Sequence, residues 1–197
     1  VAKADFCNLL SECSGVVDGG AEMLHFSIQD GRFVPKISFG SPVVSALRPH
    51  FPNTVFDVKL GVIEPEHRLN DFIKAGADIL SFHPEATLQP AAVVQMIKKE
   101  GIAPGLVLNP GTPVESIIHL LNEIEIIVIM LVSPGYGGPK YIQTAIEKIE
   151  KIIKYCDDKN INTPLIEVDG GVNPENVKRF LDVGANVVVA GSSVFSS

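Results

Sequence analysis

Short runs of apolar residues alternate along the chain with longer segments in which apolar residues recur every three or four positions. The short runs are typical of buried strands, and the longer segments are typical of amphipathic helices. The pattern predicts seven strands, at Glu22–Ile28, Thr54–Leu60, Asp78–Phe82, Ala103–Leu108, Ile126–Val132, Leu165–Val168 and Asn186–Ala190. It predicts a helix that starts near Asp5 and further helices at Pro42–Arg48, Pro65–Ala75, Pro90–Glu100, Val114–Leu121, Tyr141–Asp157 and Pro174–Val183.

Near-continuous apolar strands that alternate with amphipathic helices indicate a parallel α/β sheet covered by its helices. A repeat of roughly 25 residues predicts a (β/α)8 barrel, the TIM-barrel fold, and a doubly wound open sheet is the alternative. Only Val1-Ala2-Lys3 precedes the first helix, and the sequence ends at Ser197. We therefore expect one barrel domain over residues 1–197, with its first strand and last helix incomplete.

Composition narrows the class of protein. The 197 residues are 46% hydrophobic and 20% charged, which is typical of an ordinary globular chain. A formal net charge of −7 argues against nucleic acid or an anionic membrane as a partner. The 3 cysteines show no C-x-x-C spacing, which favours a reducing compartment. The longest apolar run, Ile126–Val132, is too short to cross a bilayer, so a cytoplasmic protein is expected.

Three glycine-rich turns follow late strands of the predicted barrel. Glycine lets the backbone approach an anion closely, and helix N-termini offer free N–H groups, so these turns are expected to hold a phosphate group. Barrels commonly bind phosphate on the loops after their last strands. The candidate phosphate-binding residues are Gly135, Gly137, Gly138, Gly170, Gly171, Gly191 and Ser192.

The first predicted strand carries polar side chains that could take part in a reaction, in contrast to the phosphate-binding turns. In Leu24–Pro35 the sequence reads LHFSIQDGRFVP, and His25 and Ser27 share one face because side chains alternate along a strand. The strand breaks at Gln29-Asp30-Gly31 into a loop. The spacing predicts that an imidazole and a hydroxyl face a common pocket.

Several motifs together resemble those of the ribulose-phosphate 3-epimerase family, over nearly the whole chain. They are Ala4-Asp5-Phe6 with Asn8-Leu9, His25 with Asp30–Pro35, Phe39-Gly40, Ala75–Asp78, Asn109–Pro113, Pro134–Gly138, Glu167–Val172 and Val189–Ser192. The resemblance implies an isomerase of the pentose phosphate pathway that interconverts D-ribulose 5-phosphate and D-xylulose 5-phosphate by proton transfer at C3.

In the family, two aspartates act as acid and base, and a divalent metal (Zn, Fe, Mn or Co) is held by the same aspartates and two histidines. The resemblance places these four roles at His25, Ser27, Lys59 and Asp169. His25 and Asp169 keep the family's residue types as metal positions, whereas Ser27 replaces an aspartate and Lys59 replaces a histidine.

These two replacements change the expected chemistry. A serine hydroxyl is a weak acid and a poor metal ligand beside a carboxylate. The Lys59 ammonium would repel a dication, so we expect a metal to bind weakly or not at all. Lys59 would instead pair with Asp169 and stabilise an enediolate itself.

Other interpretations stay open at this point. The alternatives are a non-catalytic homologue that binds a sugar phosphate and an epimerase of ketohexose 6-phosphates. A lysine-dependent decarboxylase is a third possibility, because Asp57-x-Lys59 is similar to the Asp-x-Lys-x-x-Asp strand of sugar-phosphate decarboxylases, although Val62 stands at the second aspartate. A homo-oligomer is expected from the apolar loop residues Phe33 and Phe39.

Histidines outside the first strand are expected to play lesser parts. His83 and Glu85 follow a strand end, where a hydrogen-bonded supporting role is expected. His50, His67 and His119 fall on predicted helices or loops and are expected to face solvent.

Overall fold

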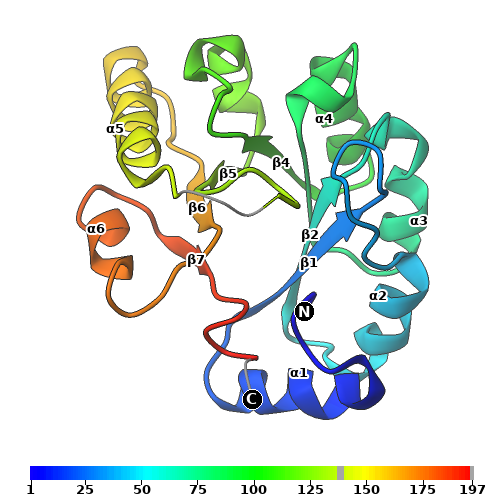
Figure 1. Cartoon of the computed structure of the whole chain (residues 1–197). Helices are drawn as coiled ribbons and strands as arrows, with labels where there is room; N and C mark the ends of the chain where they lie inside the picture. The colour runs from blue at the N-terminus through cyan, green and yellow to red at the C-terminus, as the bar shows by residue number, and fades with distance from the viewer. Residues whose placement is uncertain (137–139, 196–197) are drawn as a thin grey trace.

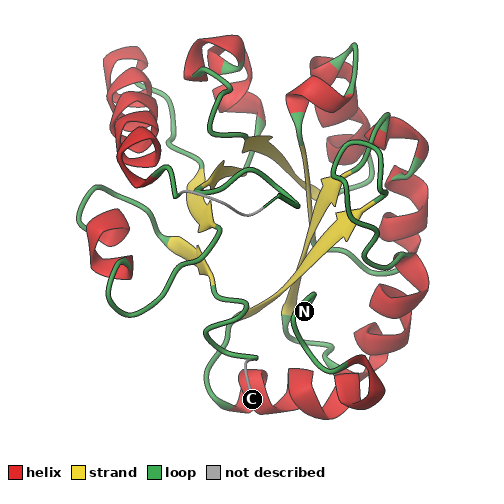
Figure 2. Cartoon of the chain, in the orientation of Figure 1, coloured by secondary structure: helices red, strands yellow, loops and turns green. Residues whose placement is uncertain are grey.

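A computed structural model of the chain describes residues 1–136 and 140–195. It shows a parallel sheet curved into a barrel, with helices around its outer side (Figure 1; Figure 2). The strands pair in the order β1-β2-β3-β4-β5-β6-β7, which is their order in the sequence. A doubly wound sheet reverses this order part-way, so the barrel prediction is confirmed and the open-sheet alternative is wrong. The strands are β1 (Met23–Gln29), β2 (Val55–Gly61), β3 (Ile79–Phe82), β4 (Ala103–Leu108), β5 (Ile126–Met130), β6 (Leu165–Asp169) and β7 (Val187–Val189).

Helices connect the strands on the outside of the barrel (Figure 1). The α-helices are α1 (Leu9–Asp18), α2 (Ser41–Leu47), α3 (Leu69–Lys74), α4 (Pro90–Lys99), α5 (Ile142–Lys159) and α6 (Val177–Leu181). Short 3-10 helices are η1 (Phe6–Asn8), η2 (Arg48–His50), η3 (Pro65–His67), η4 (Pro84–Ala86), η5 (Val114–Ser116) and η6 (Ile118–Glu123). Within the described residues, no helix is long and apolar enough to cross a membrane.

Three predicted helices differ from the observed ones. The segment Pro65–Ala75 forms η3 and α3, which are separated at Arg68. The segment Val114–Leu121 forms η5 and η6, which are separated at Ile117, instead of one α-helix. This segment is rich in β-branched residues, whose side chains lose rotamer freedom in an α-helix. The α-helix predicted from Pro174 begins at Val177, and the residues before it form a turn that Asn173 caps. The Asn173 carboxamide oxygen accepts hydrogen bonds from the backbone N–H groups of Glu175 and Asn176, as the side chain of a helix N-cap does.

The first residues of the chain lie between the two edge strands. The backbone nitrogen of Val1 donates to the carbonyl oxygen of His25 on β1 at 2.9 Å. The Lys3 side chain lies against Gly191, which follows β7. In the described part of the chain no strand precedes α1 and no helix follows β7.

The core lies between the strands and the helices, and polar side chains point to the barrel axis. Fully buried apolar side chains from β1 to β4, among them Phe26, Phe56, Leu80 and Leu106, form the layer beneath the helices. Buried polar residues occupy the alternate positions: Asp57 and Lys59 on β2, Ser81 on β3 and Glu167 on β6. Burying charge costs free energy unless a partner neutralises it, so the contacts of these side chains decide what the barrel interior can do.

Candidate active site

A cavity of about 710 Å³ opens among the carboxyl ends of the strands and the turns that follow them. Its walls come from β1, β2, β5, β6 and β7. The structure brings most of the candidate site residues together here: His25, Ser27, Lys59, Asp169, Gly135, Gly170, Gly171, Gly191 and Ser192 all line the cavity. The candidates Gly137 and Gly138 lie outside the described residues.

Strand register sets the positions of the polar side chains. On β1 and β2, His25 lies opposite Asp57 and Ser27 lies opposite Lys59. On β5 and β6, Asp169 lies opposite Met130. Parallel strands present alternate side chains to the axis. The polar groups therefore form two levels: a deeper level that contains His25, and an upper level, nearer the carboxyl ends of the strands, that contains Lys59.

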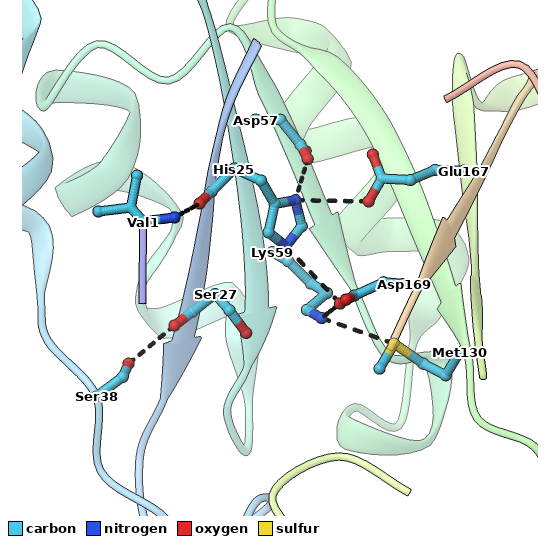
Figure 3. Close-up of polar contacts among 9 residues, drawn as sticks. All are labelled: Val1, His25, Ser27, Ser38, Asp57, Lys59, Met130, Glu167 and Asp169. Atoms are coloured by element: carbon cyan, nitrogen blue, oxygen red, sulfur yellow. Dashed lines mark hydrogen bonds and ion pairs between the residues drawn. The ribbon is translucent and has the colours of Figure 1, made fainter. Parts of the chain in front are cut away.

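The deeper level orients the His25 ring (Figure 3). The Nδ1 atom of His25 is hydrogen-bonded to Oδ2 of Asp57 and lies 3.5 Å from Oε1 of Glu167. A carboxylate can only accept, so Nδ1 carries the hydrogen of this bond. The Nε2 atom has no hydrogen-bond partner among the described residues and lies 3.9 Å from Oδ2 of Asp169. The ring therefore presents Nε2 to the upper level.

Glu167 lies beside His25 as a fully buried carboxyl group. Burial, and next the negative charge of Asp57, raise the pKa of Glu167 well above its usual value. The neutral acid is therefore the favoured form of this side chain.

The upper level holds an ion pair (Figure 3). The Lys59 ammonium donates to Oδ2 of Asp169, and its Nζ lies 3.6 Å from Sδ of Met130. Burial raises the pKa of Asp169, but the opposing charge of Lys59 leaves it below its ordinary value. Asp169 is therefore a carboxylate at neutral pH, and Lys59 is its counter-ion.

Ser27 lines the cavity beside this pair, and the loop after β1 is fixed close by. The carbonyl oxygen of Ser27 accepts from the Ser38 hydroxyl at 2.9 Å. Asp30 accepts from the backbone N–H groups of Arg32 and Phe33 through Oδ1, and its Oδ2 accepts from the N–H of Ile63. Asp30 thus shapes the loop, whereas no hydrogen bond of the Ser27 hydroxyl is found among the described residues.

The glycine-rich turns need glycine for steric reasons. Gly170 and Gly171 have φ of +122° and +68°, which disfavour other residues. A Cβ on Gly135 would lie 2.4 Å from Cγ1 of Val34, so this turn packs directly on the loop after β1. Within the described part of the chain, the backbone N–H groups of Gly171 and Ser192 donate to no protein acceptor.

The sequence-based phosphate argument also used helix N-termini beside the turns. Among the described residues, α5 begins at Ile142 after the first turn and α6 begins at Val177 after the second, and no helix follows Gly191. A positive group that the sequence argument did not name also lies here. The Lys140 ammonium donates to the carbonyl oxygen of Gly171 at 2.9 Å.

His83 and Glu85, which follow β3, differ in their hydrogen bonds. His83 is completely buried, and neither ring nitrogen has a hydrogen-bond partner among the described residues, so the predicted hydrogen-bonded role is wrong for it. Glu85 does support a loop, because it accepts from the Asn109 carboxamide at 3.2 Å and from the Thr112 hydroxyl. The histidines expected to face solvent are exposed, as predicted: His50, His67 and His119.

Phe33 and Phe39 are less exposed than the sequence suggested. The Phe33 ring packs on His83 with a centroid distance of 4.7 Å. The Phe39 ring packs on Phe6 and Phe26, at 5.4 Å and 6.4 Å. Both rings are half-buried within the chain, so they give little support to the expected oligomer interface.

Asp57 and Glu167 are site residues that sequence reasoning missed. Each stands two positions before a candidate residue, Asp57 before Lys59 and Glu167 before Asp169. The alternation of side chains along a strand places such pairs on the same face, so the signal was present in the sequence.

The residues present do not fit a divalent metal. A dication held by His25 Nε2 and Asp169 would lie next to the Lys59 ammonium that Asp169 already binds. At about 4 Å and an effective dielectric constant of about 20, the repulsion between these cations is about 8 kcal/mol. A second group, His25, Asp57 and Glu167, has possible ligand atoms within 4.8 Å of one another. There the His25 nitrogen donates to Asp57, and the neutral form of Glu167 is favoured, so this group is also a poor ligand set.

Comparison with known proteins places the chain among named relatives. A model of the ribulose-phosphate 3 epimerase family matches residues 1–195. The chloroplastic ribulose-5-phosphate-3-epimerase of Arabidopsis thaliana is 44% identical over 199 residues, which cover 100% of this chain and 70% of that protein. The ribulose-phosphate 3-epimerase of Bacillus subtilis (strain 168) is 42% identical over 195 residues, which cover 99% of this chain and 89% of that protein.

Solved structures with low sequence identity share the fold. A 3-keto-L-gulonate-6-phosphate decarboxylase from Vibrio cholerae aligns with a TM-score of 0.71 at 12% identity, covering 100% of this chain and 88% of that one. A tryptophan synthase α-subunit from Pyrococcus furiosus aligns with a TM-score of 0.70 at 20% identity, covering 98% and 84%. These likenesses support the barrel architecture and nothing more specific.

Proposed function

The chain belongs to the ribulose-phosphate 3-epimerase family of isomerases, and from this premise we propose that it interconverts D-ribulose 5-phosphate and D-xylulose 5-phosphate by moving the proton at C3. The observation that carries the proposal is the ionised Asp169 that lines the cavity, next to Nε2 of His25. A carboxylate within reach of a carbon next to a ketone is suited to accept its proton.

The proposed roles follow from the contacts of each residue. Asp169 takes the C3 proton, and Lys59 holds Asp169 in its ionised form. His25, oriented by Asp57, offers Nε2 to a substrate hydroxyl. Ser27 is the only residue of the set without an ionisable group, and its hydroxyl is suited to bind a substrate oxygen.

The phosphate group is proposed to lie at the glycine-rich turns. Gly135, Gly170, Gly171, Gly191 and Ser192 line the same cavity as Asp169, so one sugar phosphate can reach both regions. The free N–H groups of Gly171 and Ser192 support this placement. Lys140 adds a positive charge beside them.

The proton at C3 gives a direct test. Incubation of the protein with D-ribulose 5-phosphate in heavy water, followed by NMR, is expected to show deuterium at C3 and the appearance of D-xylulose 5-phosphate. Exchange without inversion would indicate that a single base acts. No exchange would leave a non-catalytic sugar-phosphate-binding protein as the better account.

Two competing substrates belong in the same experiment. If a ketohexose 6-phosphate exchanges its C3 proton for deuterium faster than the pentose phosphate does, the ketohexose phosphate is the better substrate. The proposed proton transfer would stay the same. Release of carbon dioxide from a 3-keto sugar-acid phosphate would instead favour the decarboxylase, which Lys59 on β2 allows in principle.

Assembly and location stay predictions. Cys7, Cys13 and Cys156 are all free thiols, which supports the predicted reducing, cytoplasmic setting. A homo-oligomer is still expected, and size-exclusion chromatography with light scattering tests it.

A further inference from the structure

We propose that the Lys59 ammonium takes the place of a divalent metal and stabilises the enediolate, so that this chain processes its ketose phosphate without a metal ion. The inference rests on the proposed function, because it concerns the intermediate of that reaction. Its basis is the ion pair between Lys59 and Asp169, which both line the cavity (Figure 3).

Lys59 is held as a fixed cation inside the barrel. The side chain rises from the middle of β2 and is only 4% exposed, so its ammonium has little freedom to leave the site. Its partners among the described residues are Oδ2 of Asp169 and the weakly accepting sulfur of Met130. An ammonium group has three hydrogens, so at least one remains for a substrate oxygen.

The charge of the site is conserved during the proposed step. The C3–H bond breaks, and its proton goes to the Asp169 carboxylate. The electron pair of that bond forms a C2=C3 double bond, and the carbonyl π pair moves to the C2 oxygen. Asp169 becomes neutral as the oxygen becomes negative, so the partner of Lys59 changes from carboxylate to enediolate.

This exchange of partners favours the transition state. The contact between Lys59 and the C2 oxygen strengthens only as negative charge develops there, which is the condition for lowering a barrier. The cation is already in place, and so the site does not have to recruit one. The charge of Lys59 also disfavours a dication at His25 and Asp169. The Lys59 ammonium and a divalent metal are therefore alternative ways to stabilise the enediolate.

The test uses Lys59→Met, which keeps the length of the side chain but removes its charge. Deuterium exchange at C3 is expected to fall by roughly 100- to 1000-fold, as when one oxyanion donor is removed. Lys59→Arg, which keeps the charge, is expected to recover part of the rate. Lys154→Met removes an exposed lysine of α5 that pairs with Asp158, and it is expected to exchange like the wild type.

Metal binding is measured separately by calorimetry with Mn²⁺. The wild type is expected to show no binding, and its exchange rate is expected to survive treatment with EDTA. The double variant Ser27→Asp, Lys59→His restores the family's ligand types, and it is expected to bind Mn²⁺ and to become sensitive to EDTA.

Three results would overturn the inference: Mn²⁺ binding to the wild type that His25→Ala abolishes, loss of wild-type exchange in EDTA, or wild-type exchange in a folded Lys59→Met variant. Folding of each variant is checked by thermal unfolding and by binding of inorganic phosphate. A wild type that shows no exchange with or without Mn²⁺ contradicts the proposed function itself, so the two failures are distinguishable.

Discussion

Glu167 and Asp169 stand two residues apart on β6, and their surroundings favour opposite protonation states. Glu167 is enclosed with Asp57 and favours its neutral form, whereas Asp169 pairs with Lys59 and is ionised. Carboxyl groups whose pKa values are pushed apart in this way can take different roles in proton transfer. The site therefore has one carboxylate ready to accept a proton, and Glu167 is suited to hold His25 in place.

His83 provides a test at the level of a single side chain. Burial, and next the charge of Lys59, lower the pKa of His83 from 6.5 to about 3. Below pH 6.5 the unfolded chain binds a proton here that the folded chain does not, so acidification destabilises the fold. Between pH 6.5 and about 5, this residue is expected to reduce the free energy of unfolding by about 2 kcal/mol.

The measurement is urea unfolding of the wild type and of His83→Leu at both pH values. The variant lacks the titrating group and is expected to lose less stability on acidification than the wild type. His67→Leu, at an exposed histidine, is the matched control and is expected to follow the wild type. Equal pH dependence in His83→Leu and the wild type would mean that His83 is protonated in the folded protein.

At the scale of elements, a buried lysine connects α5 to the loop after β4. Lys148 lies on the buried face of α5, and its ammonium donates to the carbonyl oxygens of Asn109 and Pro110, at 2.5 Å and 2.9 Å. These carbonyls belong to the loop after β4, which Glu85 also holds from the side of β3. The lysine thus fixes a loop at the same end of the barrel as the cavity.

Replacing Lys148 by methionine tests this connection. Two carbonyl oxygens would lose their charged donor, so the free energy of unfolding is expected to fall by about 1–3 kcal/mol in urea. Lys154→Met on the same helix removes a surface ion pair and is expected to change stability by less than about 0.5 kcal/mol. Similar losses in both variants would argue that the buried contacts of Lys148 contribute little.

The sequence predicted elements better than it predicted contacts. The helical spacing in Tyr141–Asp157 predicted α5 almost to its observed ends, because helix and strand periods are local properties of the chain. The same periodicity in Val114–Leu121 predicted one α-helix, where the structure has the two short 3-10 helices η5 and η6. The pairing of Lys59 with Asp169 joins positions 110 residues apart. The resemblance placed these two residues in one site, but only the closed barrel shows which atoms meet.

Over the whole molecule, burial is uneven around the barrel. All residues of β3 and β5 are buried, whereas the three residues of β7 are only half-buried. In addition, β7 pairs with β6 through only three residue pairs. Local opening is therefore expected at β7 before the rest of the sheet, because it breaks few buried contacts.

Hydrogen exchange measured by mass spectrometry or NMR tests this expectation and the phosphate site together. Amides of β3 and β5 are expected to exchange only through global unfolding, and those of β7 are expected to exchange faster. Saturating inorganic phosphate is expected to slow exchange at Gly171 and Ser192, whose N–H groups have no acceptor among the described residues. Chloride at the same ionic strength is the control. If phosphate slows these two amides no more than chloride does, the phosphate group of the substrate must be held elsewhere in the cavity.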